Sequence, residues 1–575
     1  MLLQLGALLL LLLGCSYAAD PVADKVTSLP GLSFKIDYGV WSGYLNAGNN
    51  GTWKMHYWLV ESKSNPKTDP ILVWFNGGPG CSSFGGMFEE LGPFYVSQDG
   101  KTLFENKFSW NQKANVLALE SPIGVGFSYD SSNLNYSTAN DVQSMNQNFA
   151  ALNDFFKSFP DYANRDFYLS GESYAGIYIP MLSAVLAEGI VAKTFVNPNF
   201  QGAAIGNGYM HIQKLYNSLV LWSAYHGRVS PQEWEYVKTT CNAGATRPND
   251  PDTYNYFNYL KTTTYLDFAS DNSTCGDIIY RMTSVPRSSD PYNYYQDCFA
   301  SKYADGYTGA SASRPAHPAQ MKRIRRKREA AQPGVKADVT NLAAGFNYDS
   351  SDPYQGYACY GSPYIWANTQ EVQKALNIAD DWQKGGMKWQ DCSDPIYQQY
   401  TVTYNDQTQF FERFFKANTN TKFRFLVYNG DVDTVCNYLG DAWFIADYAA
   451  AHAIKADDRI DWYFAGQTAG YSQRYNDNSG VTIDVVTVKG AGHFVPTDRP
   501  GAARQMITNF MFPSQANGRP DYNSTANVDP YPTLAPILNG GQSTVSPVPT
   551  TSSTIQLSYF APLLLSIFCV LKNIL

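Results

Sequence analysis

Residues 167–176 read Phe-Tyr-Leu-Ser-Gly-Glu-Ser-Tyr-Ala-Gly, an apolar run followed at once by small and polar residues. The apolar start is typical of a strand, and the residues after it predict a tight turn into a helix. Gly171 and Ala175 stand two residues before and two residues after Ser173. Small residues at these positions let strand and helix backbones approach, so the turn could present a nucleophilic serine. A purely structural Gly/Ser turn is the alternative.

Other apolar runs predict further strands bounded by turn residues; they lie at residues 71–75, 116–119, 423–428 and 485–488. Residues 139–159 have apolar side chains at helical spacing, which predicts a helix whose buried face carries Val142, Met145, Phe149, Leu152, Phe156 and Phe159. Strands that alternate with helices indicate an α/β fold, with a mostly parallel central sheet and helices on both faces.

The composition is that of a globular protein. Hydrophobic residues make up 44% of the 575 positions, which is enough to build a large core. The net charge of -8 argues against a nucleic-acid partner, because phosphate binding needs a dominant basic surface. The length allows one large α/β domain with insertions.

The N-terminus predicts export. A leucine run at residues 8–13 precedes small residues near Ala18 and Ala19, so residues 1–19 are expected to be a signal peptide. A lipoprotein signal at Cys15 is the alternative. Seven cysteines between the signal and the C-terminal tail suggest three bridges and one free thiol, although the residues alone do not fix the pairing. Sites for N-glycosylation fit the same compartment: Asn50, Asn135, Asn272 and Asn523.

Two regions depart from the alternating pattern. Residues 233–360 are rich in Tyr, Asn, Asp, Ser and Cys and predict an inserted cap over one end of the sheet. Its loop 314–332 carries the basic run 322–328, which is expected to be exposed, either as a solvated loop or as a processing site. The main domain is expected to span residues 20–512. The remainder, 513–575, is predicted to be a Pro/Ser/Thr-rich linker with an apolar tail that is either a lipid-anchor signal or a sticky, disordered terminus.

A nucleophilic serine needs a base and a carboxylate that orients the base. His493 lies in a glycine-rich loop directly after the strand at 485–488. Asp431 and Asp433 follow the strand at 423–428, and the residues alone do not separate them. The order Ser, Asp, His along the chain is that of the α/β-hydrolase fold.

Backbone donors for an oxyanion are expected in two places. The glycine-rich residues 76–83 follow the strand at 71–75, and Tyr174 directly follows the serine. A phosphate-binding loop is the competing interpretation, but no Gly-Lys-Ser/Thr follows at the required spacing. We expect neither a metal nor a cofactor.

Six motifs occur in one order along the chain: Trp74-Phe-Asn-Gly-Gly-Pro-Gly-Cys-Ser-Ser83, Glu90-Leu-Gly-Pro93, Glu120-Ser-Pro-Ile-Gly-Val-Gly-Phe-Ser-Tyr129, Gly171-Glu-Ser-Tyr-Ala-Gly176, Asp433 with Cys436-Asn437, and Gly492-His-Phe-Val-Pro496. Together they resemble the serine carboxypeptidase family of vacuoles and lysosomes over about residues 30–512. The resemblance implies removal of C-terminal residues from peptides and proteins through an acyl-enzyme, at acidic pH, in a lysosome, a vacuole or outside the cell.

The resemblance also implies residue roles. It makes Ser173 the nucleophile and His493 the base, with Asp433 rather than Asp431 as its partner. It implies oxyanion donors at Gly78 and Tyr174 and a site for the substrate carboxylate at Asn76, Gly77, Glu90 and Glu172. It implies the bridges Cys81–Cys392, Cys241–Cys275 and Cys298–Cys359, with Cys436 free.

Some features leave alternatives open. Residues 206–211 lack an acidic residue that often follows this segment in the family, and Phe494 stands where some relatives have Met, so the side-chain preference is not carried over. The same triad could serve an esterase or acyltransferase. A broken triad would favour a binding or protective protein instead of an enzyme, but every member of the triad is present in the sequence. Glu172 could also merely brace the turn. We hypothesise cleavage at residues 325–328, which would leave two chains joined by disulfides.

Overall fold

The computed structural model describes residues 19–538, except for 98, 243–249, 264–267, 285–289 and 296–361. Most of the expected signal peptide, the basic loop with its hypothesised cleavage site, and the C-terminal tail from residue 539 lie outside the described residues. So do Cys298 and Cys359.

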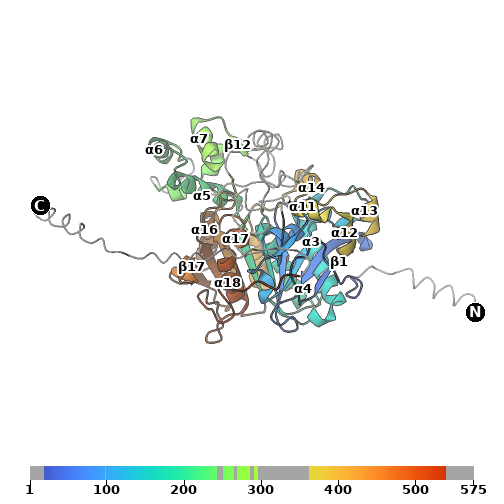
Figure 1. The fold of residues 1–575 in the computed structure, drawn as a ribbon. Helices are drawn as coiled ribbons and strands as arrows, with labels where there is room; N and C mark the ends of the chain where they lie inside the picture. The colour runs from blue at the N-terminus through green and yellow to red at the C-terminus, as the bar shows by residue number, and fades with distance from the viewer. Residues whose placement is uncertain are drawn as a thin grey trace, which may run out of the picture. The chain divides into compact units, whose positions relative to one another are not determined.

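A twelve-stranded sheet forms the centre of the described chain (Figure 1). Six central strands run parallel, in the spatial order β6 (Asn115–Leu119), β3 (Ile71–Phe75), β9 (Phe167–Ser173), β10 (Phe200–Gly208), β14 (Arg424–Gly430) and β18 (Thr482–Val488). The expected α/β-hydrolase architecture, with its mostly parallel sheet, is confirmed.

Antiparallel strands extend the sheet on both sides. On one side β2 (Trp53–Val60) pairs with β6, with β1 (Val40–Asn46) and with β7 (Tyr129–Asp130). On the other side β17 (Gln467–Asn476) pairs with β18, with β15 (Lys455–Ala456) and with β16 (Ile460–Phe464). The parallel strands are therefore interior, which explains the apolar runs of strands such as β3 and β6, whereas β10 is buried with a glycine-rich sequence and was not predicted.

Two hydrophobic cores lie on opposite faces of the sheet. Val73 belongs to one core, whereas its neighbours Leu72 and Trp74 belong to the other, because successive side chains of a strand point to opposite faces. The first core is completed by α3 (Asp141–Ser158), α4 (Ala175–Val191), α15 (Thr408–Ala417) and α16 (Tyr438–Ala451). The second is completed by α2 (Ser83–Glu89), α11 (Ser362–Ala367), α12 (Gln370–Ala375), α13 (Asp380–Lys384) and α18 (Pro500–Met511).

The helix predicted at residues 139–159 is α3, but one residue of its predicted buried face is wrong. Val142 is 37% exposed, whereas Phe155, which was not predicted, is fully buried. The helix begins at Asp141, and the side chain of Asn140 caps it by accepting from the Gln143 backbone N–H at 2.9 Å. Asp141 is itself buried, and this orients the first turn with Val142 toward solvent.

The described part of the cap, which was predicted at residues 233–360, shares a small core with the helix that precedes those bounds. Helices α5 (Ile212–Tyr225), α6 (Pro231–Thr240) and α7 (Thr274–Thr283) lie together in Figure 1, with β12 (Phe268–Ser270) beside them. β12 pairs with β11 (Leu260–Thr262). Val220, Val237 and Ile279 are fully buried there, and Cys241–Cys275 joins two of the elements.

The second described bridge, Cys81–Cys392, also has the expected pairing, and Cys436 is a buried free thiol as expected. Short elements complete the described chain: β4 (Phe94–Val96), β5 (Leu103–Glu105), β8 (Ala139–Asn140), α14 (Asp394–Gln399), β13 (Tyr400–Thr401) and α17 (Val495–Asp498). Within the described ranges, we find no helix with the length and apolar character needed to span a membrane.

Residues 513–538 differ from the linker expected after Phe512, because they pack along the main domain. The Tyr522 hydroxyl donates to Asp484 Oδ2 at 2.7 Å, and the Leu538 N–H donates to the Ser33 carbonyl at 3.0 Å. The segment forms only local turns of its own, such as the Gly518 N–H donating to the Ser514 carbonyl at 2.8 Å, and partners on the domain satisfy other polar groups.

Candidate active site

Ser173 lies at the end of β9, where the chain turns sharply into α4. Its φ of 61° is in the left-handed region, which is uncommon for a residue other than glycine. A Cβ added to Gly171 would lie 2.4 Å from the Phe75 carbonyl oxygen and 2.7 Å from Ala175 Cβ. The two small residues around the serine are therefore required by the close packing of strand and helix, and the turn has the geometry of a nucleophile elbow.

The structure separates the two candidate aspartates. His493 Nδ1 lies 2.7 Å from Asp433 Oδ2, and both side chains are almost completely buried. Asp431 instead accepts from the Gly490 N–H at 2.7 Å. Asp433 is therefore the carboxylate that can hold the imidazole in one orientation and tautomer.

Asp433 receives three further hydrogen bonds. Its Oδ2 accepts from Asn207 Nδ2 at 2.9 Å and from the Cys436 N–H at 3.0 Å. Its Oδ1 accepts from the Val435 N–H at 2.8 Å. Four donors, including the histidine, replace the water that this buried carboxyl group has lost, and they fix its position beside His493.

Asn207 was not predicted from the sequence. Its amide also ties β10 to the end of β14, because its Oδ1 accepts from the Gly430 N–H at 3.0 Å, and to the loop that follows, because its Nδ2 donates to the Cys436 carbonyl at 3.2 Å. Its φ of 41° is unusual for a residue other than glycine. An asparagine between two glycines at the end of a strand, Gly206-Asn-Gly208, is a sequence signal that could have suggested a special backbone position.

The glycine-rich loop after β3 packs directly against the elbow. A Cβ added to Gly77 would lie 2.5 Å from the Tyr174 backbone nitrogen and 2.6 Å from Ser173 Cβ. Gly78 has a φ of 110°, a conformation that a side chain would strain. This close approach brings the backbone of the loop beside the nucleophile, where oxyanion donors are needed.

A pair of buried glutamates lies next to the elbow, joined by one asparagine. Asn76 Nδ2 donates to Glu90 Oε1 at 2.9 Å and to Glu172 Oε1 at 3.1 Å. The amide orientation follows from its other contact, in which the Trp74 indole N–H donates to Asn76 Oδ1 at 2.6 Å. The indole therefore turns both amide hydrogens toward the two glutamates.

The two glutamates favour a shared proton. Burial raises the pKa of Glu90 to about 7. Burial, and then the charge of Glu90, raise the pKa of Glu172 well above its ordinary value. Glu90 Oε2 and Glu172 Oε2 are buried and receive no N–H or O–H from the described residues. A proton on Glu172 that is donated to Glu90 satisfies both carboxyl groups.

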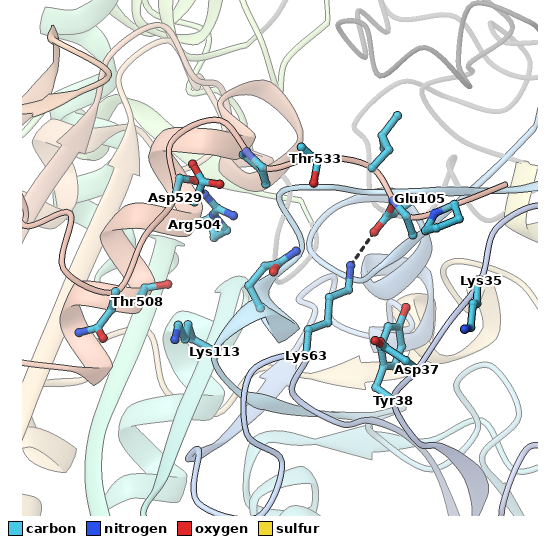
Figure 2. Close-up of a pocket in the computed structure, with 16 residues that line it drawn as sticks. Lys35, Asp37, Tyr38, Lys63, Glu105, Lys113, Arg504, Thr508, Asp529 and Thr533 are labelled. Carbon is cyan, nitrogen blue, oxygen red and sulfur yellow. Dashed lines mark hydrogen bonds and ion pairs between the residues drawn. The ribbon is translucent and has the colours of Figure 1, made fainter.

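Other buried ionisable groups have different roles. His56 is fully buried, with its Nδ1 2.8 Å from Glu120 Oε2. No group of residues that could hold a metal ion occurs among the described His, Cys, Asp and Glu. A cavity of about 590 Å³ lies where Lys63 contacts Glu105 at 2.8 Å, and Figure 2 shows Arg504 of α18 among the residues that line it. The residues around that cavity include none of the predicted catalytic or carboxylate-binding residues.

Comparisons with known proteins identify the family of the chain. The sequence model for serine carboxypeptidases matches residues 30–513. This chain belongs to the serine carboxypeptidase family. It is therefore a serine-type carboxypeptidase, and the resemblance inferred from the six motifs is confirmed.

The relatives cover nearly the whole chain. The serine carboxypeptidase ctsa-3.1 of Caenorhabditis elegans is 46% identical, over 90% of this chain and 93% of that protein. The lysosomal protective protein of Mus musculus is 34% identical, over 88% of this chain and 97% of that protein. The prohormone-processing carboxypeptidase Kex1 of Saccharomyces cerevisiae shares the fold, with a TM-score of 0.59 at 20% identity, over 87% of this chain and 99% of that one.

Proposed function

We propose that this carboxypeptidase removes the last residue of a peptide through an acyl-enzyme on Ser173. The Ser173 hydroxyl oxygen attacks the carbonyl carbon of the last peptide bond, and His493 Nε2 takes the hydroxyl proton. The N–H groups of Gly78 and Tyr174 donate to the oxyanion. The contact between His493 Nδ1 and Asp433 supports these roles, because it leaves Nε2 as the atom that exchanges the proton.

The second half of the reaction restores the enzyme. His493 gives its proton to the nitrogen of the departing amino acid as the peptide bond breaks. Water then attacks the Ser173 ester, losing a proton to His493, and the Ser173 oxygen recovers that proton as the shortened peptide leaves. No metal or cofactor takes part in this scheme.

One observation carries the proposal that the enzyme recognises a free C-terminus: the glutamate pair held by Asn76 beside the nucleophile. A protonated Glu172 can turn its proton from Glu90 to the substrate carboxylate, where the Gly77 N–H is a second donor. Asn76 joins them by moving one amide hydrogen from a glutamate to the substrate. The substrate's own negative charge further favours keeping the proton on the pair. Recognition would therefore be strongest when the pair retains its proton.

An acidic compartment suits this chemistry. The raised pKa values of Glu90 and Glu172 keep the shared proton at lysosomal or vacuolar pH. The mouse relative is named a lysosomal protein. We therefore place the enzyme in the secretory pathway and its acidic end compartments, with peptides and protein C-termini as substrates.

Several features of the chain fit that route. The four proposed N-glycosylation sites, Asn50, Asn135, Asn272 and Asn523, are all exposed. The signal peptide and the C-terminal lipid anchor remain proposals that rest on the sequence of residues outside the described structure.

The deciding experiment compares two substrates that differ only at their end. Purified enzyme is given a blocked dipeptide with a free C-terminal carboxylate and the same dipeptide with an amidated C-terminus, at pH 5. We expect turnover of the free acid and far slower turnover of the amide, with Ser173→Ala as the inactive control. Equal turnover of both would reject carboxylate recognition and favour a general esterase or amidase.

A further inference from the structure

A six-residue segment of the predicted insertion, residues 290–295, lies against the two loops that carry the catalytic acid and base. We call this segment the clip. On the acid side, both the backbone N–H and the hydroxyl of Thr434 donate to the Pro291 carbonyl, at 3.1 Å and 2.6 Å. The Tyr294 N–H donates to the Val432 carbonyl at 3.1 Å. The clip therefore bonds to the residues on either side of Asp433.

On the base side, the clip bonds to His493 itself. The His493 N–H donates to the Tyr292 carbonyl at 2.7 Å, and the two rings lie 4.8 Å apart between centroids. Gly492 leaves no space for a side chain here, because an added Cβ would lie 2.1 Å from the Tyr292 carbonyl oxygen and 2.8 Å from Asn293 Cβ. Tyr292 and Asn293 are each at most 5% exposed, so the clip is part of the buried structure.

A carboxyl group links the clip to the same loop a second time. Asp498 Oδ2, at the end of α17, accepts from the Gly492 N–H at 2.7 Å and from Asn293 Nδ2 at 3.0 Å. The acid and base loops also share a direct backbone bond, from the Val432 N–H to the Ala491 carbonyl at 3.0 Å. The clip adds a second connection between these two loops, because Thr434 of the acid loop donates to Pro291 and His493 of the base loop donates to Tyr292.

We propose that Asn293 is a positioning residue for the reaction: through Asp498 and Gly492 it holds the His493 loop in register with Asp433. The inference rests on the proposed roles of Ser173 and His493. The 2.7 Å contact between His493 and Asp433 depends on two loops from different strands, and a displacement of about 1 Å in such a geometry can cost about 100-fold in rate. A segment of the insertion therefore helps set the turnover number.

The clip leaves substrate binding to other residues. Its bonds to the acid and base loops run from Pro291, Tyr292, Asn293 and Tyr294, whereas the terminal carboxylate is assigned to the pair held by Asn76. Loss of the Asn293 amide should therefore lower kcat and leave KM nearly unchanged. A general loss of folding would instead reduce the amount of active enzyme and the melting temperature together.

A charge variant adds a readout that a structural role alone does not predict. Asn293→Asp would place a second carboxyl group 3.0 Å from Asp498 Oδ2. Burial raises the pKa of Asp498 to about 7, Asp290 of the clip adds to this rise, and Arg499 opposes it. Glu90 also senses the charge of Asp498. At pH 5 the two carboxyl groups can share a proton and keep the link, whereas at pH 8 both ionise and repel.

The experiment uses the full-length enzyme with Asn293→Ala and Asn293→Asp. The matched control is Asn258→Ala, an exposed asparagine of the same insertion whose side chain bonds to Asn255. We expect Asn293→Ala to lower kcat about 10- to 100-fold with KM within about twofold. Asn293→Asp should retain most of the wild-type kcat at pH 5 and lose it by pH 8. Asn258→Ala should match the wild type at both pH values.

Labelling by a fluorophosphonate probe separates this inference from the proposed triad. The probe reacts with an activated serine and needs no peptide, so wild-type enzyme should be labelled and Ser173→Ala should not. Failure of the wild type to label would reject the triad itself. Wild-type labelling rates in both Asn293 variants, or equal losses in Asn293→Ala and Asn258→Ala, would overturn the role of the clip.

Discussion

Two buried carboxyl sites flank the same elbow and are held in opposite ways. Asp433 accepts from His493 and from three N–H donors. Glu90 and Glu172 share a single asparagine amide. Both sites are removed from water to a similar degree, so burial alone does not explain their different chemistry. Four donors fix Asp433 beside His493, whereas the glutamate pair has fewer donors, and burial raises the pKa values of both glutamates so that the pair retains a proton.

The difference suits the two tasks. The triad carboxylate must be negative to stabilise an imidazolium, whereas the substrate-binding pair must offer a hydrogen to a carboxylate. Metal-free enzymes commonly recognise a carboxylate with Arg or Lys. Here acidic side chains do the same when protonated, and this makes recognition depend on pH.

The largest loss of kcat is expected from removing the nucleophile Ser173 or the base His493. Ser173→Ala and His493→Ala should each lower kcat by about 10⁴-fold or more, because the members of a triad act as a unit. Steady-state hydrolysis of the free-acid dipeptide measures the loss, and circular dichroism checks the fold. Substantial remaining peptidase activity in either variant would contradict the assignment.

The same change from carboxyl to amide tests both sites directly. Asp433→Asn should lower kcat by about 10⁴-fold, because an amide cannot hold the required histidine tautomer. The NH₂ group of the new asparagine would also point at N–H donors that now bond to the Asp433 carboxyl oxygens, and this would disfavour the present arrangement. Glu172→Gln should stay within a few-fold of wild type at pH 5, since glutamine supplies the hydrogen that protonated Glu172 supplies. Similar losses in both variants would remove the distinction between the two sites.

The pH dependence of KM is a smaller and more specific effect. Since the pKa of Glu90 is raised to about 7 and that of Glu172 is also raised, the pair should lose its proton between mildly acidic and mildly alkaline pH. KM for free-acid peptides should climb by about tenfold, the worth of one hydrogen bond to a charged group. Glu172→Gln, a permanently neutral donor, should flatten this climb. Parallel KM profiles would indicate that Glu172 only braces the elbow.

Much of this site could be predicted because its signals are local. The elbow follows from small residues around Ser173, and five of the six parallel strands follow from apolar runs, whereas the glycine-rich β10 was missed. The choice of Asp433 over Asp431 needed either the family resemblance or the structure, since both residues end the same strand. Val142 was misassigned because a helical period does not reveal that Asp141 is buried in the first turn.

The supporting residues were harder to predict because their partners are distant in the sequence. Asn207 meets Asp433 across 226 residues, and Asn293 meets Asp498 across 205. A single sequence carries no periodic signal for such pairs. Residues 513–538 resembled a linker because their own composition favours no element, although the domain supplies their hydrogen-bond partners.

The smallest expected effect concerns the free energy of unfolding, which should depend on pH because several buried carboxyl groups of the fold retain protons. Burial raises the pKa values of Glu90, Asp441 and Asp498 to about 7, and that of Glu172 also rises. Between the ordinary carboxyl values and pH 7 the folded chain therefore binds more protons than the unfolded chain, so the free energy of unfolding falls as pH rises. This contribution is fully present below about pH 4 and is lost as pH passes 7, at a cost on the order of 3–4 kcal/mol for each of Glu90, Asp441 and Asp498.

The melting temperature should accordingly decline from pH 5 to pH 8, with a shallower decline in Glu172→Gln, which has one proton fewer to lose. Thermal unfolding at constant ionic strength measures both slopes. A melting temperature that rises over this interval would mean that these carboxyl groups are ionised in the fold, and Glu172 could not then be the hydrogen donor that the substrate carboxylate requires.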